Sequence, residues 1–435
     1  MKNILIRVLF LIFTISLSVV VLSSCSHKHN FIMQIANDSY IASNATCGDK
    51  ATYYYSCECG ERGAETFEYG EALGHGFNED NYCECGEYNW GLAFTYNNGA
   101  ITGLTDIGRT LKQLKIPESI NNENIIAIGK NAFEGCWALT NIEIPNSVTS
   151  IGDFAFMGCT SLQNIKIPDG VTHIGANAFD HCIKLASIAI SNSVINIAVN
   201  AFSSCTSLTN IVVDNGNPYY CSIEGNLFSK DRKTLVYYAI GKIQTSFTVP
   251  NSVTCIGNSA FSGGVKLMSV AIPNSVISIG NYAFSSCTSL TSIEIPNSVT
   301  SIGMGAFLNC SSLTSIEIPN SITSFNDNTF SNCVSLKSIV IPTSVTNIGE
   351  SVFASCTSLE SVVIPNSVTS VGELAFYGCS SIRSVKIPRS VIEIGAWAFV
   401  NCPNLTIYCR ATSKPSGWDD KWNAHNFLVV WNYVG

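Results

Sequence analysis

The chain has 435 residues, of which 46% are hydrophobic and only 12% are charged, and its formal net charge is -8. This composition provides more core material than one ordinary domain needs, and it excludes a largely disordered chain. Lys and Arg form no cluster in the sequence. A nucleic-acid partner is therefore not expected, because phosphate neutralisation requires a basic face.

The first 24 residues have the pattern of an export signal. Lys2 and Arg7 precede an apolar run, and small residues then lead to Cys25. A membrane-spanning anchor is the alternative, but a span needs about 20 apolar residues and Arg7 interrupts the run. Small residues ahead of a cysteine resemble the bacterial lipobox, which implies lipid on Cys25 and anchoring to the outer membrane or cell surface. Residues 25–45 are then a tether.

Residues 46–90 form a second region, rich in Cys, Gly, Glu and Tyr, in which the letters CECGE occur twice. Two close pairs of sulfurs about 26 residues apart can hold a zinc ion as a thiolate site. The export signal equally permits disulfides, and the C-x-C spacing is tighter than the usual metal motif. The sequence leaves zinc and disulfides open, each with a structural role for Cys57, Cys59, Cys83 and Cys85, and unpaired thiols are the third alternative.

A unit of 23 residues then repeats across residues 91–402. Every step between aligned phenylalanines is 23 residues except the one from Phe202 to Phe261. A period of this length with Leu and Ile at fixed offsets indicates a leucine-rich-repeat solenoid. The aligned residues are Phe133, Phe156, Phe179, Phe202, Phe261, Phe284, Phe307, Phe330, Phe353, Phe376 and Phe399.

The letters of one unit predict a strand, a turn and a short helical segment. Residues 293–295 alternate apolar and polar, as a strand with one buried face does, and Pro296 ends that strand. Four residues spaced as on one side of a helix predict the helical segment on the outer wall: Ala306, Phe307, Cys310 and Leu313. Gly303 suggests a turn whose φ is not strictly positive, since Ala198 replaces it in one coil; the alternative is that this coil is strained.

Ten cysteines form a column three residues after the phenylalanines, and Gly264 interrupts it. Stacked coils are about 4.8 Å apart with parallel side chains, whereas a disulfide needs Cβ atoms about 3.8 Å apart. We therefore expect free, buried thiols that fill space as small apolar groups.

Three irregular parts interrupt or close the array. The long coil at residues 214–250 holds two β-prone runs around a charged turn, which predicts a projecting hairpin near Cys221 and Cys255. A second insertion of five residues lies near Asn121 to Asn124. Residues 91–111 and 403–435 are expected to cap the two ends, the latter with three tryptophans, for which carbohydrate stacking is the alternative role.

The repeats, the long coil and the closing segment Ser413–Trp418 together resemble BspA-like leucine-rich-repeat surface proteins. This resemblance implies export and a curved, right-handed α/β solenoid with parallel strands on the concave face and short helices on the convex face. It also implies attachment to extracellular or cell-surface proteins, and no enzymatic activity or cofactor beyond the zinc considered above. A structural envelope protein without a specific ligand is the alternative function.

Two outward positions per coil remain free to carry specificity. The row between the two strand isoleucines has few charges, and we take as candidate contacts Val340, Val363, Glu294 and Glu317. Valine also simply favours strands, which is the alternative explanation for the two valines. An enzyme based on Asp180, His181 and Cys182 is not expected, because adjacent residues in a helical turn do not face one another.

Overall fold

The computed structural model describes residues 34, 36, 39, 41–43, 51–56, 62–69 and 89–434. The chain divides into two units, Met1–Asn89 and Trp90–Gly435. In the first unit, an antiparallel sheet is formed by β1 (Ile41–Ser43), β2 (Ala51–Ser56) and β3 (Arg62–Tyr69). Strand β1 lies in the segment assigned above to the tether. The helices among the described residues are too short to cross a membrane.

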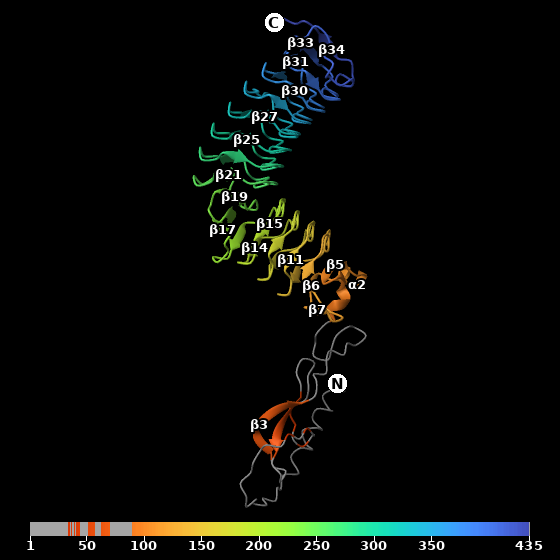
Figure 1. Cartoon of the computed structure of the whole chain (residues 1–435), viewed down its shortest axis with the longest axis vertical. Coiled ribbons are helices and arrows are strands. Elements are labelled where there is room, and N and C mark those ends of the chain that lie inside the picture. Colours follow the sequence, from red (N-terminus) through yellow and green to blue (C-terminus); the bar gives the residue numbers. More distant parts are fainter. Residues whose placement is uncertain are drawn as a thin grey trace, which may run out of the picture. The chain divides into compact units, whose positions relative to one another are not determined.

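The second unit is a solenoid whose coils follow one another in sequence order (Figure 1). The regular coils contribute two strands each, where the sequence predicted one, except that the segment of Val340 forms only an isolated bridge on the first row. We call the first row the strand face: β6 (Gln113–Lys115), β10 (Asn141–Glu143), β12 (Asn164–Lys166), β14 (Ser187–Ile190), β16 (Asn210–Val213), β20 (Ser246–Thr248), β22 (Ser269–Ala271), β24 (Ser292–Glu294), β26 (Ser315–Glu317), β29 (Ser361–Val363), β31 (Ser384–Ile387), β33 (Thr406–Cys409) and β34 (Leu428–Val430).

The second row is made mainly of two-residue strands. Their buried Ile, Val or Phe lies beside an outward polar residue. The row comprises β5 (Ala100–Leu104), β9 (Ala127–Ile128), β11 (Ser150–Ile151), β13 (His173–Ile174), β15 (Asn196–Ile197), β19 (Thr234–Tyr237), β21 (Cys255–Ile256), β23 (Ser278–Ile279), β25 (Ser301–Ile302), β27 (Ser324–Phe325), β28 (Asn347–Ile348), β30 (Ser370–Val371) and β32 (Glu393–Ile394).

The 23-residue period fixes the register of both rows. Glu294 pairs with Glu317 on the strand face, and Ile279 pairs with Ile302 in the second row, each in a parallel ladder. Equivalent residues of successive coils therefore lie next to one another in each ladder. Buried residues of one coil meet their equivalents in the next, which is how a unit too small to bury its own apolar face gains a core.

The third wall consists of turns, so the expected helical segments on this wall are wrong. In the coil of Phe307, alternate amides donate within the coil, as from Cys310 to Phe307, while the intervening ones donate to the next coil, as from Phe307 to Thr329. Two residues per coil have a positive φ, here Gly305 at 57° and Asn309 at 60°. A right-handed helix cannot include such residues, and the helical spacing of the apolar positions gave no warning of them.

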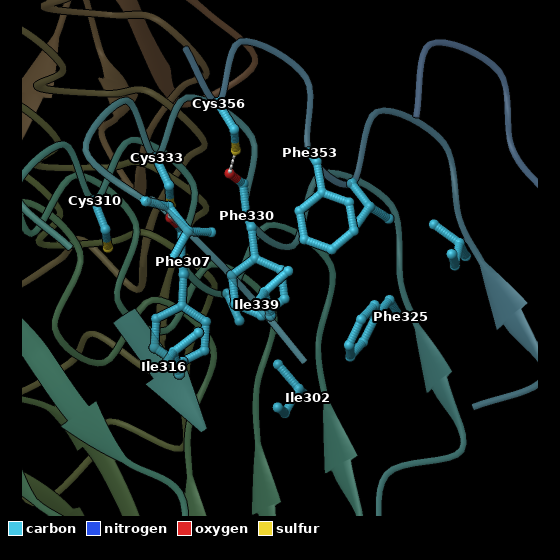
Figure 2. Packing of buried hydrophobic residues seen from close by; sticks show 14 of the residues in the cluster. Ile302, Phe307, Cys310, Ile316, Phe325, Phe330, Cys333, Ile339, Phe353 and Cys356 are labelled. Atoms are coloured by element: carbon cyan, nitrogen blue, oxygen red, sulfur yellow. Dashed lines mark hydrogen bonds between the residues drawn. The ribbon is translucent and has the colours of Figure 1, made fainter. Parts of the chain in front are cut away.

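The phenylalanines form a stacked ladder behind this wall. Phe284, Phe307 and Phe330 stack with ring centroids 5.3 and 5.6 Å apart and planes within 4° of parallel. Figure 2 shows the rings of Phe307 and Phe330 beside the labelled isoleucines Ile302, Ile316 and Ile339. The ladder ends on an edge-on aromatic at each side, Phe94 against Phe133 and Trp422 against Phe399. Stacking of one such ring on the next buries a large apolar area in every coil.

The cysteine column is a row of free thiols, as predicted. Each thiol of the column after Cys136 donates to the carbonyl oxygen of the phenylalanine 26 residues earlier; Cys356 donates to Phe330 over 3.2 Å (Figure 2). Burial raises the pKa of these thiols, for example to about 12 at Cys287 and Cys402. They therefore remain protonated donors at neutral pH.

The glycine column is explained by close packing of neighbouring coils. Gly303 has no positive φ, and a Cβ added there would lie 2.4 Å from the backbone nitrogen of Asn281. Neither Ala198 nor Asn326 lies in the left-handed region. The first of the two explanations offered above is therefore confirmed.

The long coil contains the expected hairpin around the charged turn, but this hairpin is built into the solenoid, so the expectation that it projects is wrong. Three antiparallel strands follow one another, β17 (Tyr220–Ile223), β18 (Asn226–Ser229) and β19, and the predicted charged turn joins β18 to β19. Strand β18 is buried, with Leu227 in the N-terminal core and Phe228 in the C-terminal core. Exposure of these consecutive apolar residues to water would be unfavourable. The three antiparallel strands therefore pack between the two cores. Cys221 and Cys255 are both free.

The remaining irregular parts agree with the sequence. The five-residue insertion is a hairpin, β7 (Ser119–Ile120) and β8 (Glu123–Asn124). A 3₁₀ turn, η2 (Trp90–Ala93), the strand β4 (Phe94–Asn97) and the short helix α2 (Asp106–Thr110) cover the first coil.

The tryptophans of the C-terminal segment cover the last coil. Trp418 and Trp422 are 2% and 5% exposed, and the Trp418 indole N–H donates to the carbonyl oxygen of Val391 over 3.2 Å. Trp431 packs against both indoles. These contacts fit the capping role, because the buried rings of Trp418 and Trp422 offer no surface on which a sugar could stack.

Candidate ligand-binding face

The strand face carries one outward position per coil between the two buried strand residues, and all of the positions named here are exposed. The side chains at these positions change along the solenoid. From the N-terminus they are first charged, then small, then acidic, and then apolar. The row comprises Lys115, Glu143, Lys166, Ala189, Val212, Thr248, Ala271, Glu294, Glu317, Val340, Val363 and Lys386.

Val340 and Val363 form an apolar ridge on adjacent coils. Their exposed fractions are 80% and 63%. On the strand face, the two segments pair through an isolated bridge between Ser338 and Ser361, because the Val340 segment is not part of a strand. A strand preference therefore does not account for Val340, which weakens the alternative explanation. Two neighbouring valines held outward on a rigid wall are a surface that a partner's apolar side chain could cover.

Glu294 and Glu317 lie opposite each other on β24 and β26. Neither forms an ion pair among the residues that the structure describes. Like charges on neighbouring strands repel, at a cost of a fraction of a kcal/mol up to about 1 kcal/mol. The pair thus leaves two carboxylates available to a cationic group from outside.

A small pocket, which the sequence did not predict, follows the valine ridge. Its volume is about 160 Å³, and its lining includes Val363, Lys386, Tyr408, Arg410 and Tyr433. Lys386 pairs in register with both Val363 and Tyr408, so the row continues one coil beyond the predicted positions. The Tyr433 ring reaches this face because its amide donates to the carbonyl oxygen of Cys409.

The chemistry of this pocket is cationic and aromatic. The Lys386 ammonium lies 5.4 Å from the centroid of the Tyr433 ring, and the rings of Tyr408 and Tyr433 are 4.9 Å apart. Arg410 adds a second positive charge, and no acidic residue lines the pocket. Such a lining favours an anionic group attached to an apolar or planar one. Tyr408 was detectable as the next strand position, whereas nothing in the repeat indicated Tyr433.

A groove in the strand face lies at the long coil, with a volume of about 680 Å³. Strand β16 ends one sheet and β20 begins another, and the two do not pair. Residues on both sides of this break line the groove: Thr209, Glu224, Tyr238, Lys242, Ile243, Gln244, Ser246, Phe247 and Thr248.

The repeats match the family model for the BspA type leucine rich repeat region in three overlapping segments, residues 126–244, 233–360 and 346–413. Together these segments cover more than half of the chain. The chain belongs to the BspA-type leucine-rich repeat family. No curated protein sequence matches it.

Solved structures of bacterial leucine-rich repeat proteins resemble this BspA-type chain. One from Eubacterium ventriosum is 26% identical, with a TM-score of 0.61 over 74% of this chain and 91% of its own. The pneumococcal vaccine antigen PcpA is 22% identical, with a TM-score of 0.50 over 77% and 83%, a likeness of fold alone. A leucine rich cell surface protein from Faecalibacterium prausnitzii is 24% identical over 83% and 96%, with a TM-score of 0.38.

The adjacent Asp180, His181 and Cys182 of this BspA-type array are not arranged as a nucleophile and its base. His181 contacts Asp180 at 2.9 Å, whereas the fully buried thiol of Cys182 donates to the carbonyl oxygen of Phe156. Burial raises the pKa of Asp180, and the neighbouring imidazole opposes that shift. These contacts fit a structural role for all three residues.

Four predicted sulfur ligands and the lipidation site lie outside the described residues: Cys25, Cys57, Cys59, Cys83 and Cys85. Among the residues that the structure does describe, no group of three or more His, Cys, Asp or Glu side chains could hold a metal ion. Zinc or disulfides in the Cys-rich region therefore remain a prediction.

Proposed function

We propose that this chain is an exported, lipid-anchored surface protein that binds another protein through the C-terminal half of its strand face. The observation that carries the proposal is the valine ridge of Val340 and Val363 beside the cationic and aromatic pocket. Membership of the leucine-rich repeat family supports a protein ligand. A catalytic role has no supporting observation on this face, and we propose a binding function only.

The spacing of the ridge and the pocket suggests the chemistry of the ligand. Adjacent coils are about 4.8 Å apart, and an extended peptide advances about 3.3 Å per residue. A peptide running along the solenoid with an apolar side chain over Val363 thus brings a residue two or three positions further to Lys386 and Arg410. A carboxylate at that point would meet two positive charges and no acidic residue.

Substitution of both valines tests the proposal. Val340→Glu with Val363→Glu should place two negative charges beside the pocket and reduce capture of the protein partner at least about tenfold, a loss of about 1.4 kcal/mol. Pull-downs with host matrix proteins and with surface proteins of partner bacteria provide the measurement. Ala189→Glu with Val212→Glu is the matched control, since these two residues also lie in register on adjacent coils.

Two outcomes would contradict this function. Equal binding by the wild-type chain and the double valine variant would remove the ridge as a contact. No captured protein under any condition, with the chain present on the cell surface, would favour the alternative of a structural envelope protein. Anchoring is tested separately, because Cys25→Ser should abolish incorporation of a labelled fatty acid and release the chain from membranes.

A further inference from the structure

The groove at the long coil has an open strand edge on one of its sides. On the β16 side, the edge is occupied, because the Ile211 amide donates to the carbonyl oxygen of Gly225 and the Ser222 hydroxyl donates to that of Ile211. On the other side, β20 pairs only with β22, its neighbour toward the C-terminus. The 13 residues added to this coil thus separate two strands that a regular coil would pair.

The backbone of β20 shows which groups are left unpaired. Thr245 accepts from the coil of β22 and Val249 donates to it, so main-chain groups at every second residue face β22. The intervening residues, Ser246 and Thr248, direct their N–H and C=O groups toward the groove. No hydrogen bond joins these groups to any other residue in the described part of the chain.

The groove beside this edge is lined by apolar and neutral polar side chains, by Lys242 and by Glu224. Ile243 is 85% exposed, and the Phe247 and Tyr238 rings lie 4.7 Å apart. The Lys242 ammonium donates to the main-chain oxygen of Glu224 and to Oδ1 of Asn226, and lies 5.4 Å from the centroid of the Tyr238 ring.

Lys242 is thus held by neutral oxygens. It forms no ion pair among the described residues. Burial lowers the pKa of this lysine, while the Glu224 charge partly opposes the shift. A partly desolvated cation without a carboxylate within ion-pair distance favours a negative group from a ligand.

We propose that the groove binds an extended, acidic segment of a partner polypeptide, which adds to the Ser246–Thr248 edge as a further parallel strand. Main-chain hydrogen bonds to β20 hold the segment, an apolar side chain packs on Ile243 and Phe247, and an Asp or Glu pairs with Lys242. The site is separate from the valine ridge and does not depend on the function proposed for it. The added strand would pair an edge that the solenoid otherwise leaves open.

Selection from a displayed library of random decapeptides on the full chain in detergent tests this proposal. Enriched peptides should alternate apolar residues and carry an acidic one. Ser246→Pro removes one amide donor at the strand start and should weaken binding at least about tenfold, whereas Ser246→Ala keeps the donor and should bind within about twofold. Lys242→Met should abolish the preference for Asp and Glu while apolar selection persists.

A selected peptide resynthesised with N-methyl groups separates strand addition from side-chain binding. Methylation at alternate residues should abolish binding, and methylation at the intervening residues should leave it unchanged, because only every second amide faces β20. Uniform tolerance of N-methylation would overturn the strand-addition mechanism. Selection of peptides insensitive to Ser246→Pro and Lys242→Met, or preferential binding of uronic-acid oligosaccharides in the groove, would overturn the site. Thermal melting of each variant confirms that it is folded.

Discussion

The regular coils and the long coil differ in how completely their main-chain groups and buried side chains are paired with those of adjacent coils. From Phe261 to Phe399 the rings stack face to face, and each thiol in that run after Gly264 bonds to the preceding coil. In the long coil, Tyr237 and Tyr238 replace the stacked ring, and the strand face is interrupted. Regular coils thus leave few groups for a ligand, whereas the long coil leaves a strand edge and an exposed isoleucine.

Alkaline pH should have the largest effect and should act on the regular coils. Burial raises the pKa of Cys182, Cys287 and Cys356 from 9.0 to about 12. A raised native pKa means that the contribution to stability is complete below pH 9 and is lost as the pH rises toward 12. Each such thiol should reduce the free energy of unfolding by about 1.4 kcal/mol per pH unit above 9.

Urea unfolding at pH 8 and pH 10 measures this loss. A variant with Cys→Ala at these three positions should be less stable at pH 8 but should show a shallower decline between the two values. Equal slopes for this variant and the wild-type chain would show that the thiols do not account for the pH dependence, and would remove this difference between the regular coils and the rest of the molecule.

An intermediate effect is expected where the long coil joins the N-terminal coils. The Tyr237 hydroxyl accepts from the Ala201 amide over 2.8 Å and donates to the carbonyl oxygen of Ala198. Tyr237→Phe should cost about 1–2 kcal/mol, because buried polar groups lose a partner. It should also separate the unfolding of the two halves, measured by calorimetry as a second transition.

Tyr238→Phe is the matched control for that variant. It alters the neighbouring ring, which packs at a tilt against Phe247 and Phe261. We expect one transition with little change in the midpoint. Identical calorimetric profiles for the two variants would argue that the Tyr237 hydroxyl does not couple the halves.

The smallest effect should come from relieving strain in one regular coil. Leu374 has a φ of 55°, a conformation that costs a residue of this kind about 1 kcal/mol and that asparagine tolerates well. Leu374→Asn should stabilise the chain by about 0.5–1 kcal/mol, provided that the half-buried leucine contributes little packing. Asn328→Leu, at the equivalent position two coils earlier, should destabilise by a similar amount in chemical denaturation.

Much of the architecture could be predicted from sequence because 23-residue periodicity constrains it repeatedly. The buried Phe, Ile and Cys positions followed from that period, as did the free state of the thiols. The prediction of a helical wall was wrong because apolar spacings of three and four residues do not distinguish a helix from successive turns. The residues with a left-handed backbone also include Phe154 and Tyr282, whose side chains do not favour that conformation. Tertiary hydrogen bonds to the next coil stabilise those conformations instead.

The candidate site was less predictable because it depends on departures from the repeat. The exposed valines were visible as outward letters, but the pocket requires the C-terminal tail to bring Tyr433 back over the strand face. The long coil held one overlooked signal, since Tyr238 lies 23 residues before Phe261 and packs against its ring. Once that tyrosine takes the ring position, the inserted residues fall before it.

The uniform hydrogen bonding between regular coils has a consequence for how the molecule can change in length. Each such coil offers the same amide donors, carbonyl acceptors, ring and thiol to both of its neighbours. Duplication or loss of a whole 23-residue unit between Phe284 and Phe376 would therefore join surfaces that already match. Copy number can drift there, while the long coil, whose two sides differ, stays single and keeps its groove at a fixed place in the fold.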